Sequence, residues 1–141
     1  MSPSTSNILI VDPDLTITDK RGVVRRIDSR PEWWIHNSLT SFKLEFNYQV
    51  SQRGGKRHPG GIVVDFVVYA GLVTALEYLG AYWHTGRFGM NDALKWSYLA
   101  RVYDRVLLLA DEPLPAMGGW VATDVVTDQE SCDQVIRKHF M

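Results

Sequence analysis

Two acidic residues stand inside segments that are otherwise almost entirely apolar. Asp65 is the only charge in residues 62–69, and Glu77 is the only charge in residues 72–79. Both segments are apolar and rich in β-branched residues, and a short turn at Ala70-Gly71 joins them, so they are predicted to be consecutive buried strands. A carboxylate in such a strand needs a partner, because burying it unpaired is costly.

Carboxylates on paired strands can converge on one metal ion. Neighbouring antiparallel strands lie about 5 Å apart, so side chains on one face of the pair come close together. Mg²⁺ prefers oxygen ligands, often one or two carboxylates together with water and substrate phosphate. The alternative is an ordinary buried ion pair, or an acid at a strand end that reaches solvent. The two acids alone do not decide between these interpretations.

The loop after the second strand holds further polar groups. It contains His84 and Arg87, and Lys95 follows at the start of a predicted helix. A histidine here could act as a general base, a general acid or a phosphate contact, while the two cations could neutralise phosphate charge. Packing of a Trp-His pair into the core, or a hydrogen-bonded scaffold histidine, would explain the same residues without catalysis.

A basic, glycine-rich loop is predicted over residues 52–61, between two strands. Its basic residues are Arg53, Lys56, Arg57 and His58, and Arg25 and Arg26 form a second cluster. These side chains could bind phosphates, and each phosphate neutralised would steepen the salt dependence of duplex binding by about 0.9 in log–log slope. A solvated hairpin tip would explain the same charges.

Local signals place these residues on defined elements. Ser29 is a possible N-cap, Pro31 fits a first helical turn, and Glu32 lies near the positive end of the helix dipole. Helical spacing continues to residue 42, and residues 44–50 then alternate as a strand does.

The second half of the chain has similar signals. A helix is predicted from a cap at Asn91 or Asp92 to about Tyr103, with an inner side made of Leu94, Tyr98, Leu99 and Val102. A buried strand follows at 106–110. Thr127 with Glu130 matches a capping box for a C-terminal helix.

The resulting order is α-β-β-β-α-β, which predicts an α/β fold with a mixed sheet flanked by helices. Residues 1–30 are predicted to be an N-terminal arm, either a β-ribbon or an extended tail, and residues 31–141 the main domain. An arm of this kind often becomes ordered only against a neighbour, so it could mediate formation of a homo-oligomer or contact an assembly partner.

Bulk properties narrow the class of protein. The chain has 141 residues, 45% of them hydrophobic and 22% charged, with a formal net charge of −1. This composition predicts one globular domain without a membrane span. Because the net charge is close to zero, only local basic patches can indicate a nucleic-acid partner. The single cysteine, Cys132, excludes a disulfide within the chain and a cysteine-rich zinc site, and a reducing cytoplasm is the default compartment.

The central half of the chain, residues 31–112, resembles PD-(D/E)XK (restriction-endonuclease-like) nucleases. Four short motifs in a set order carry this resemblance: Gly61-Ile-Val-Val-Asp65, then Ala75-Leu-Glu77-Tyr-Leu-Gly80-Ala-Tyr-Trp-His84, then Asp92-x-x-Lys95, then Tyr103-Asp-Arg-Val106. The nearest branch is the very-short-patch-repair group, in which a Trp-His run follows the third strand. The resemblance implies the restriction-endonuclease-like fold, Mg²⁺ or Mn²⁺ as cofactor, and DNA as substrate.

The resemblance assigns roles residue by residue. Asp65 and Glu77 match the two metal-binding acids, and His84 matches the histidine that assists catalysis. Glu32 takes the place of the glutamate that many members carry on the first helix. Leu79 occupies the position of the usual lysine; histidine-using branches tolerate that loss, and Lys95 could also reach in from its helix. The chain also cannot build the Cys/His zinc site of the repair enzymes.

Two main hypotheses follow. The first is a metal-dependent DNA endonuclease or nickase, in which Asp65 and Glu77 hold the ion, His84 assists proton transfer, and Arg87 or Lys95 stabilises charge. The second is a non-catalytic structural or interaction module on a former nuclease fold, such as a component of a phage virion or mobile element. A silent nucleic-acid binder is a third possibility. The expected location is the cytoplasm, or for a phage protein the host cytoplasm or virion.

Overall fold

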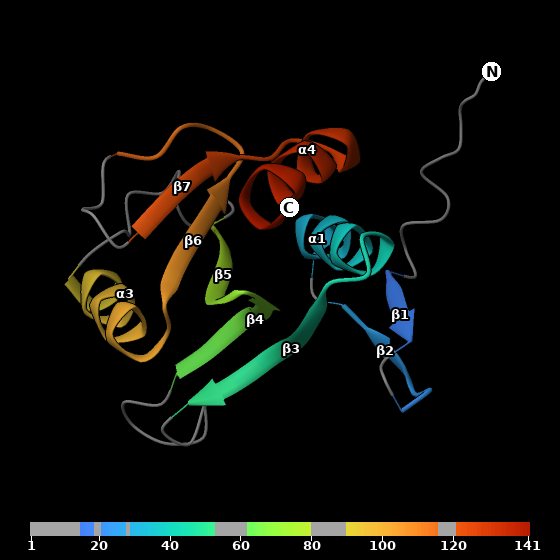
Figure 1. Cartoon of the computed structure of the whole chain (residues 1–141), viewed down its shortest axis with the longest axis horizontal. Coiled ribbons are helices and arrows are strands. Elements are labelled where there is room, and N and C mark those ends of the chain that lie inside the picture. Colours follow the sequence, from blue (N-terminus) through green and yellow to red (C-terminus); the bar gives the residue numbers. More distant parts are fainter. Residues whose placement is uncertain (1–14, 19–20, 28, 53–61, 80–89, 116–120) are drawn as a thin grey trace.

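The computed structural model describes residues 15–18, 21–27, 29–52, 62–79, 90–115 and 121–141. Its main feature is a five-stranded mixed sheet in the order β3-β4-β5-β6-β7 (Figure 1). The strands are β3 (Glu45–Gln52), β4 (Ile62–Ala70), β5 (Leu72–Leu79), β6 (Arg105–Ala110) and β7 (Val121–Val125). β3, β4 and β5 pair antiparallel, whereas β6 and β7 continue the sheet in parallel. The predicted α/β class with a mixed sheet flanked by helices is therefore confirmed.

Helix α1 (Arg30–Ser41) begins where its capping signals predict. The Ser29 hydroxyl accepts a hydrogen bond from the Glu32 backbone N–H, and Pro31 lies in the first turn, where its missing N–H is not needed. The helix ends in a Schellman motif, with Leu44 N–H donating to the Leu39 carbonyl at 3.0 Å. Lys43 takes the left-handed position of this motif, with φ 58°.

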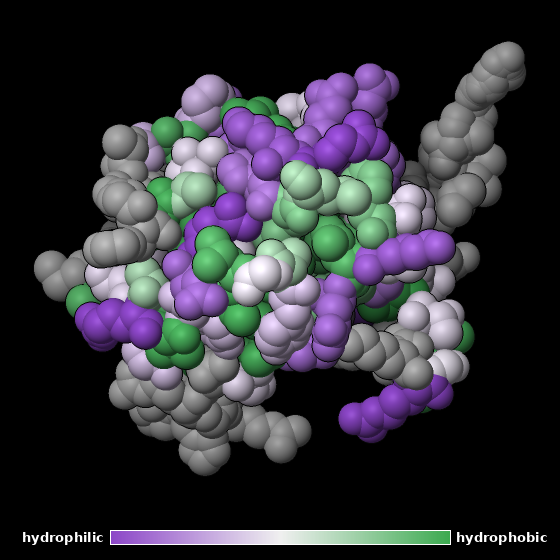
Figure 2. Space-filling view, viewed as in Figure 1, coloured by the Kyte–Doolittle hydropathy of each residue, from purple (hydrophilic) through white to green (hydrophobic). Residues whose placement is uncertain are grey.

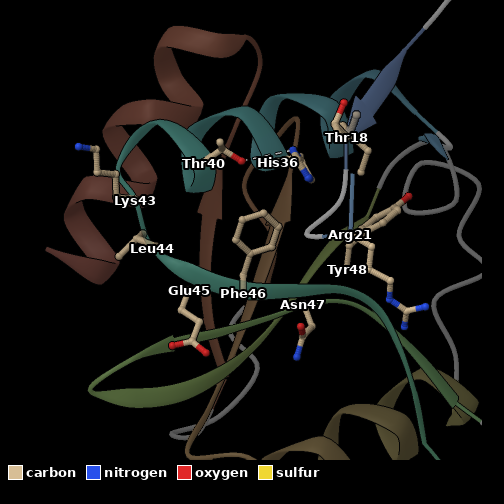
Figure 3. A pocket seen from close by; sticks show the side chains of 11 residues that line it. Thr18, Arg21, His36, Thr40, Lys43, Leu44, Glu45, Phe46, Asn47 and Tyr48 are labelled. Atoms are coloured by element: carbon tan, nitrogen blue, oxygen red, sulfur yellow. Dashed lines mark hydrogen bonds between the residues drawn. The ribbon is translucent and has the colours of Figure 1, made fainter. Parts of the chain in front are cut away.

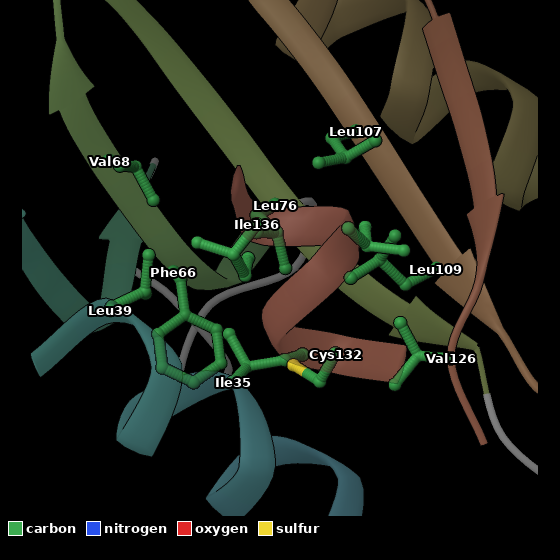
Figure 4. Packing of buried hydrophobic residues seen from close by; sticks show 11 residues of the cluster. Ile35, Leu39, Phe66, Val68, Leu76, Leu107, Leu109, Val126, Cys132 and Ile136 are labelled. Carbon is green, nitrogen blue, oxygen red and sulfur yellow. The ribbon is translucent and has the colours of Figure 1, made fainter. Parts of the chain in front are cut away.

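Helices α1 and α4 (Gln129–Phe140) cover one face of the sheet. Figure 4 shows Ile35 and Leu39 of α1 meeting Cys132 and Ile136 of α4 over Phe66. Other members of this cluster come from β4, β5, β6 and the segment after β7: Val68, Leu76, Leu107, Leu109 and Val126. Hydrophilic side chains cover the outer side of α4 (Figure 2). This cluster is the larger of two cores and fixes α1 against the sheet.

Helix α3 (Met90–Val102) covers the opposite face. Trp96 and Leu99 pack there against Val67, Val106 and Leu108, which alternate along their strands with the residues of the first core. The predicted inner side of α3 is wrong in part. Leu94 and Val102 are 61% and 47% exposed, because the helix is oriented so that the large indole of Trp96 packs against the sheet.

Two predicted helix caps also differ from the structure, and one strand was missed. Helix α3 begins at Met90, so Asn91 and Asp92 lie inside its first turn rather than capping it. The C-terminal helix is capped by Asp128 with Ser131, one residue later than the predicted pair of Thr127 and Glu130. Strand β7 was not predicted. Helix α4 begins one residue later than predicted because the Asp128 carboxylate accepts a hydrogen bond from the Ser131 N–H at 2.7 Å.

The N-terminal part contains a two-stranded antiparallel hairpin, β1 (Thr16–Thr18) and β2 (Val24–Arg26). Gly22 takes φ 81° in the connecting turn, a conformation that suits glycine. Ile17 and Ile27 are buried, and the hairpin lies beside α1. Residues 1–14 of the predicted arm lie outside the described residues. Within the described ranges, no helix is both long and apolar enough to cross a bilayer.

Candidate active site

Asp65 lies where the sheet is interrupted on both sides of β4. The β4–β5 ladder ends at the pair Phe66–Leu76, so Asp65 would next face Glu77. On the other side, the β3–β4 register passes over Asp65 and Gln49, and Gln49 has φ 54°. Beyond the end of the ladder, the Tyr78 N–H donates to the Asp65 carboxylate at 3.1 Å. A side chain therefore replaces the backbone acceptor at the point where the strands separate.

Glu77 is buried, with 4% of its surface exposed, and two residues of α3 contact it. Lys95 Nζ lies 2.7 Å from Glu77 Oε2. The Trp96 indole N–H donates to Glu77 Oε1 at 3.4 Å, a long hydrogen bond. Both carboxylate oxygens are thus engaged by one turn of helix, and the charge of Lys95 compensates a carboxylate that would be expensive to bury alone.

Glu32 approaches the same region from the other face of the sheet. Its position in the first turn of α1 lets the Ser29 hydroxyl donate to Glu32 Oε2 at 3.0 Å. The Tyr48 hydroxyl, on β3, donates to Glu32 Oε1 at 3.1 Å. These two contacts fix the carboxylate, and the Glu32 charge acts on Asp65.

The electrostatics of the site centre on Asp65. Burial, together with the neighbouring charges of Glu77 and Glu32, raises the pKa of Asp65 to about 7. The Tyr78 N–H and the Lys95 charge lower the pKa but do not offset these causes. Among the described residues, three carboxylates and one ammonium act on this site, and the raised pKa of Asp65 shows that it favours either a proton or a cation.

This arrangement suits an ion that keeps much of its own water. Within the residues that the structure describes, no three His, Cys, Asp or Glu side chains lie close enough together to hold a metal. Mg²⁺ is commonly held by one or two carboxylates, with waters and substrate phosphate completing its shell. Asp65 and Glu77 fit that role, since they come from facing positions of two strands and Asp65 carries the unfavourable charge.

The structure therefore brings together four of the predicted site residues, Glu32, Asp65, Glu77 and Lys95, from α1, β4, β5 and α3. The other predicted residues, His84, Arg87, Arg53, Lys56 and Arg57, lie outside the described residues.

Two partners of the acids were not predicted, Tyr48 and Trp96. For Tyr48 the signal was the alternation of β3, which points this residue toward α1. For Trp96 the signal was its place next to Lys95.

Comparison of the chain with family models, with curated proteins and with solved structures gave no match. The resemblance to PD-(D/E)XK nucleases therefore stays a prediction from the motifs.

Proposed function

We propose that the chain has the restriction-endonuclease-like fold and functions as a metal-dependent DNA endonuclease or nickase. The observation that carries the proposal is the meeting of Asp65, Glu77 and Lys95 where β4 and β5 separate, with Glu32 beside them. The element order α1-β3-β4-β5-α3-β6 supports it, because it is the predicted α-β-β-β-α-β order of such a core.

The proposed reaction is hydrolysis of a phosphodiester, in which water attacks phosphorus, one P–O bond breaks and the leaving oxygen takes a proton. A bound Mg²⁺ or Mn²⁺ would polarise the phosphate and lower the pKa of the attacking water. Asp65 and Glu77 would hold that ion through their carboxylate oxygens. His84 is proposed to assist proton transfer, and Arg87 is proposed as a phosphate contact.

Lys95 replaces the lysine that is absent at Leu79. Its ammonium approaches Glu77 from α3 rather than from β5, and 29% of its side chain remains exposed. A cation at this position can stabilise the negative charge that develops on the phosphate oxygens during attack. We propose that Lys95 does so while keeping its contact with Glu77.

The test is nicking of a supercoiled plasmid with Mg²⁺ or Mn²⁺. We expect activity in the wild type and its loss in Asp65→Ala and Glu77→Gln. Glu130→Gln is the matched control, because it removes an exposed carboxylate from the first turn of α4. Equal activity in wild type and Asp65→Ala would rule out the proposal.

A second candidate is a non-catalytic module on the same fold. The ion pair between Lys95 and Glu77 favours it, because this pair satisfies the buried carboxylate without a metal. Absence of nicking, together with a stable oligomer in light scattering, would select this candidate. Salt-sensitive DNA binding without cleavage would instead favour a catalytically inactive nucleic-acid-binding protein.

A further inference from the structure

A pocket of about 570 Å³ lies between the β1–β2 hairpin, α1 and the first half of β3 (Figure 3). Its walls come from Ile17 and Thr18 of β1, from His36 and Thr40 of α1, and from residues 44–48. Its volume falls in the range typical of small-ligand sites, and the pocket has no role in the reaction proposed above.

His36 supplies a buried polar group to this pocket. Its side chain is 8% exposed, and its Nδ1 lies 3.5 Å from the Thr40 hydroxyl, at the limit of a hydrogen bond. In the described part of the chain, no hydrogen bond to Nε2 is present. Burial lowers the pKa of His36, so the ring is neutral near pH 7 and offers one donor and one acceptor. A buried polar nitrogen without a partner is costly, which favours a ligand with a complementary group.

The wall facing α1 is aromatic and braced from behind. The centroid of the Phe46 ring lies 5.0 Å from that of His36, edge to face. Phe66, which is fully buried, supports both Phe46 and Tyr48, with ring centroids 6.1 and 5.0 Å away. A rigid aromatic wall next to a polar edge group suits a flat heteroaromatic ring, which can stack on the one and hydrogen-bond to the other.

The rim of the pocket carries charge that suits a phosphate. Arg21 and Lys43 contribute two cations and Glu45 one anion, and Asn47 adds an exposed amide. Lys43 is held there by the end of α1, since its N–H donates to the Thr40 carbonyl at 3.0 Å. A base inside the pocket would thus place its own phosphate near positive side chains.

Tyr48 connects the pocket to Glu32, one of the three acids of the site. It lines the pocket, and its hydroxyl donates to Glu32 Oε1 at 3.1 Å. Resting on the proposed nuclease function, we propose that this pocket receives one unstacked nucleobase of the DNA substrate, adjacent to the phosphodiester at the Asp65–Glu77 site. Phe46 and Tyr48 stack on the base, and His36 hydrogen-bonds to its edge.

This assignment predicts the substrate class. A paired base inside a duplex cannot enter the pocket, and extruding it costs a few kcal/mol, least when the base is already unpaired. DNA with a single-nucleotide bulge therefore avoids most of that cost. We expect it to bind about tenfold or more tightly than the matching duplex, which corresponds to about 1.4 kcal/mol.

The experiment compares the affinity of the full chain for bulged and matched duplexes by fluorescence anisotropy, with Ca²⁺ replacing Mg²⁺ to prevent cleavage. The bulged base is 5-iodouracil, and ultraviolet cross-linking followed by peptide mass spectrometry locates its contact. We expect the cross-link at Phe46 or Tyr48. Equal affinity for the two duplexes, or cross-links only outside the pocket, would overturn the inference.

Variants separate the pocket from general DNA binding. His36→Leu keeps a side chain of comparable size but removes the ring nitrogens, so the preference for the bulge should fall severalfold while binding of matched duplex is unchanged. His139→Leu is the matched control, because that histidine bonds Asp124 on β7 instead. If His36→Leu does not fold, Lys43→Gly provides a second test, since it removes a rim cation without loss of stability and should lower the salt slope of binding by about one.

The two proposals fail separately. Plasmid nicking without a preference for bulged DNA would leave the nuclease function in place and reject the pocket. A bulge preference that depends on His36, in a protein that never nicks DNA, would reject the nuclease function and retain the pocket as a binding site.

Discussion

Lys95 on α3 and Glu77 on β5 form an ion pair at 2.7 Å, on the face of the sheet that α3 covers. Only 5% of the Glu77 side chain is exposed, and its ion-pair partner comes from helix α3. The pair thus joins the packing of α3 to the proposed site, and removing either partner should affect both stability and activity.

Lys95→Met should destabilise the protein, because it leaves the buried Glu77 carboxylate without its cation. The expected loss is about 2 kcal/mol in the free energy of unfolding, toward the low end for buried pairs since Lys95 is partly exposed. Urea denaturation at pH 7 measures it. Adding Glu77→Gln to this variant should recover most of the loss, and strictly additive effects of the two changes would show that the pair is not coupled.

Asp65→Asn should stabilise the metal-free protein at alkaline pH. The pKa of Asp65 is raised from 3.8 to about 7 in the folded state, so the protein is most stable when this group is protonated and loses stability as pH rises toward 7. The variant should match the wild type near pH 4 and exceed it by about 2 kcal/mol at pH 8, allowing for partial access of water. Denaturant melts in EDTA across this range are the measurement. A difference that does not vary with pH would contradict the assignment.

Divalent cations should stabilise the wild type more at pH 8 than at pH 5.5. At the lower pH, Asp65 holds a proton that the ion must displace. Mn²⁺ at tenfold above its Kd should add about 1.4 kcal/mol, seen as a rise in Tm by calorimetry. Asp65→Asn should lose most of this rise. An equal rise in both proteins would place the ion elsewhere.

Ser29→Ala should reduce both stability and nicking. The Ser29 hydroxyl caps α1 and also holds Glu32 at 3.0 Å, so its loss should cost about 1 kcal/mol and release that carboxylate. Asp128→Ala is the matched control, because it removes the cap of α4 and touches none of the acids. It should lower the Tm without changing the nicking rate measured well below the Tm. Equal losses of activity in the two variants would show that Ser29 acts through stability alone.

Lys43→Gly should stabilise the fold. Lys43 takes φ 58° at the end of α1, where glycine is normally preferred, so the change should gain about 0.5–1 kcal/mol. Thermal denaturation monitored by circular dichroism measures this. Ser41→Gly is the contrasting control, since it lies in the helix and should lose stability. A loss of stability in Lys43→Gly would mean that the side chain contributes more than the backbone strain costs.

Elements with strong local signals were predictable from the sequence alone. Strands β4 and β5 follow from two apolar, β-branched runs on either side of Gly71, which has φ 79° in the turn. Ser29, Pro31 and Glu32 likewise mark the start of α1. Local conformational preferences and nearest-neighbour hydrogen bonds are enough to define these boundaries.

Strand β7 depends on tertiary structure. Its sequence is VATDV, every residue is only half-buried, and its pairing comes from β6. No periodicity within the segment specifies it. The inner face of α3 is similar, because one large indole at Trp96 decides which side packs, against the pattern formed by Leu94 and Val102.

The candidate site was likewise predictable from the sequence only in part. The sequence by itself determined that Asp65 and Glu77 are the unusual residues, because a charge inside an apolar strand needs a partner wherever it occurs. Only the tertiary structure decided which partners these are: the Tyr78 N–H where the ladder ends, Lys95 and Trp96 from α3, and Glu32 from the opposite face. The reason is that the need for compensation is a property of the residue and its segment, whereas the source of compensation is a contact between segments far apart along the chain.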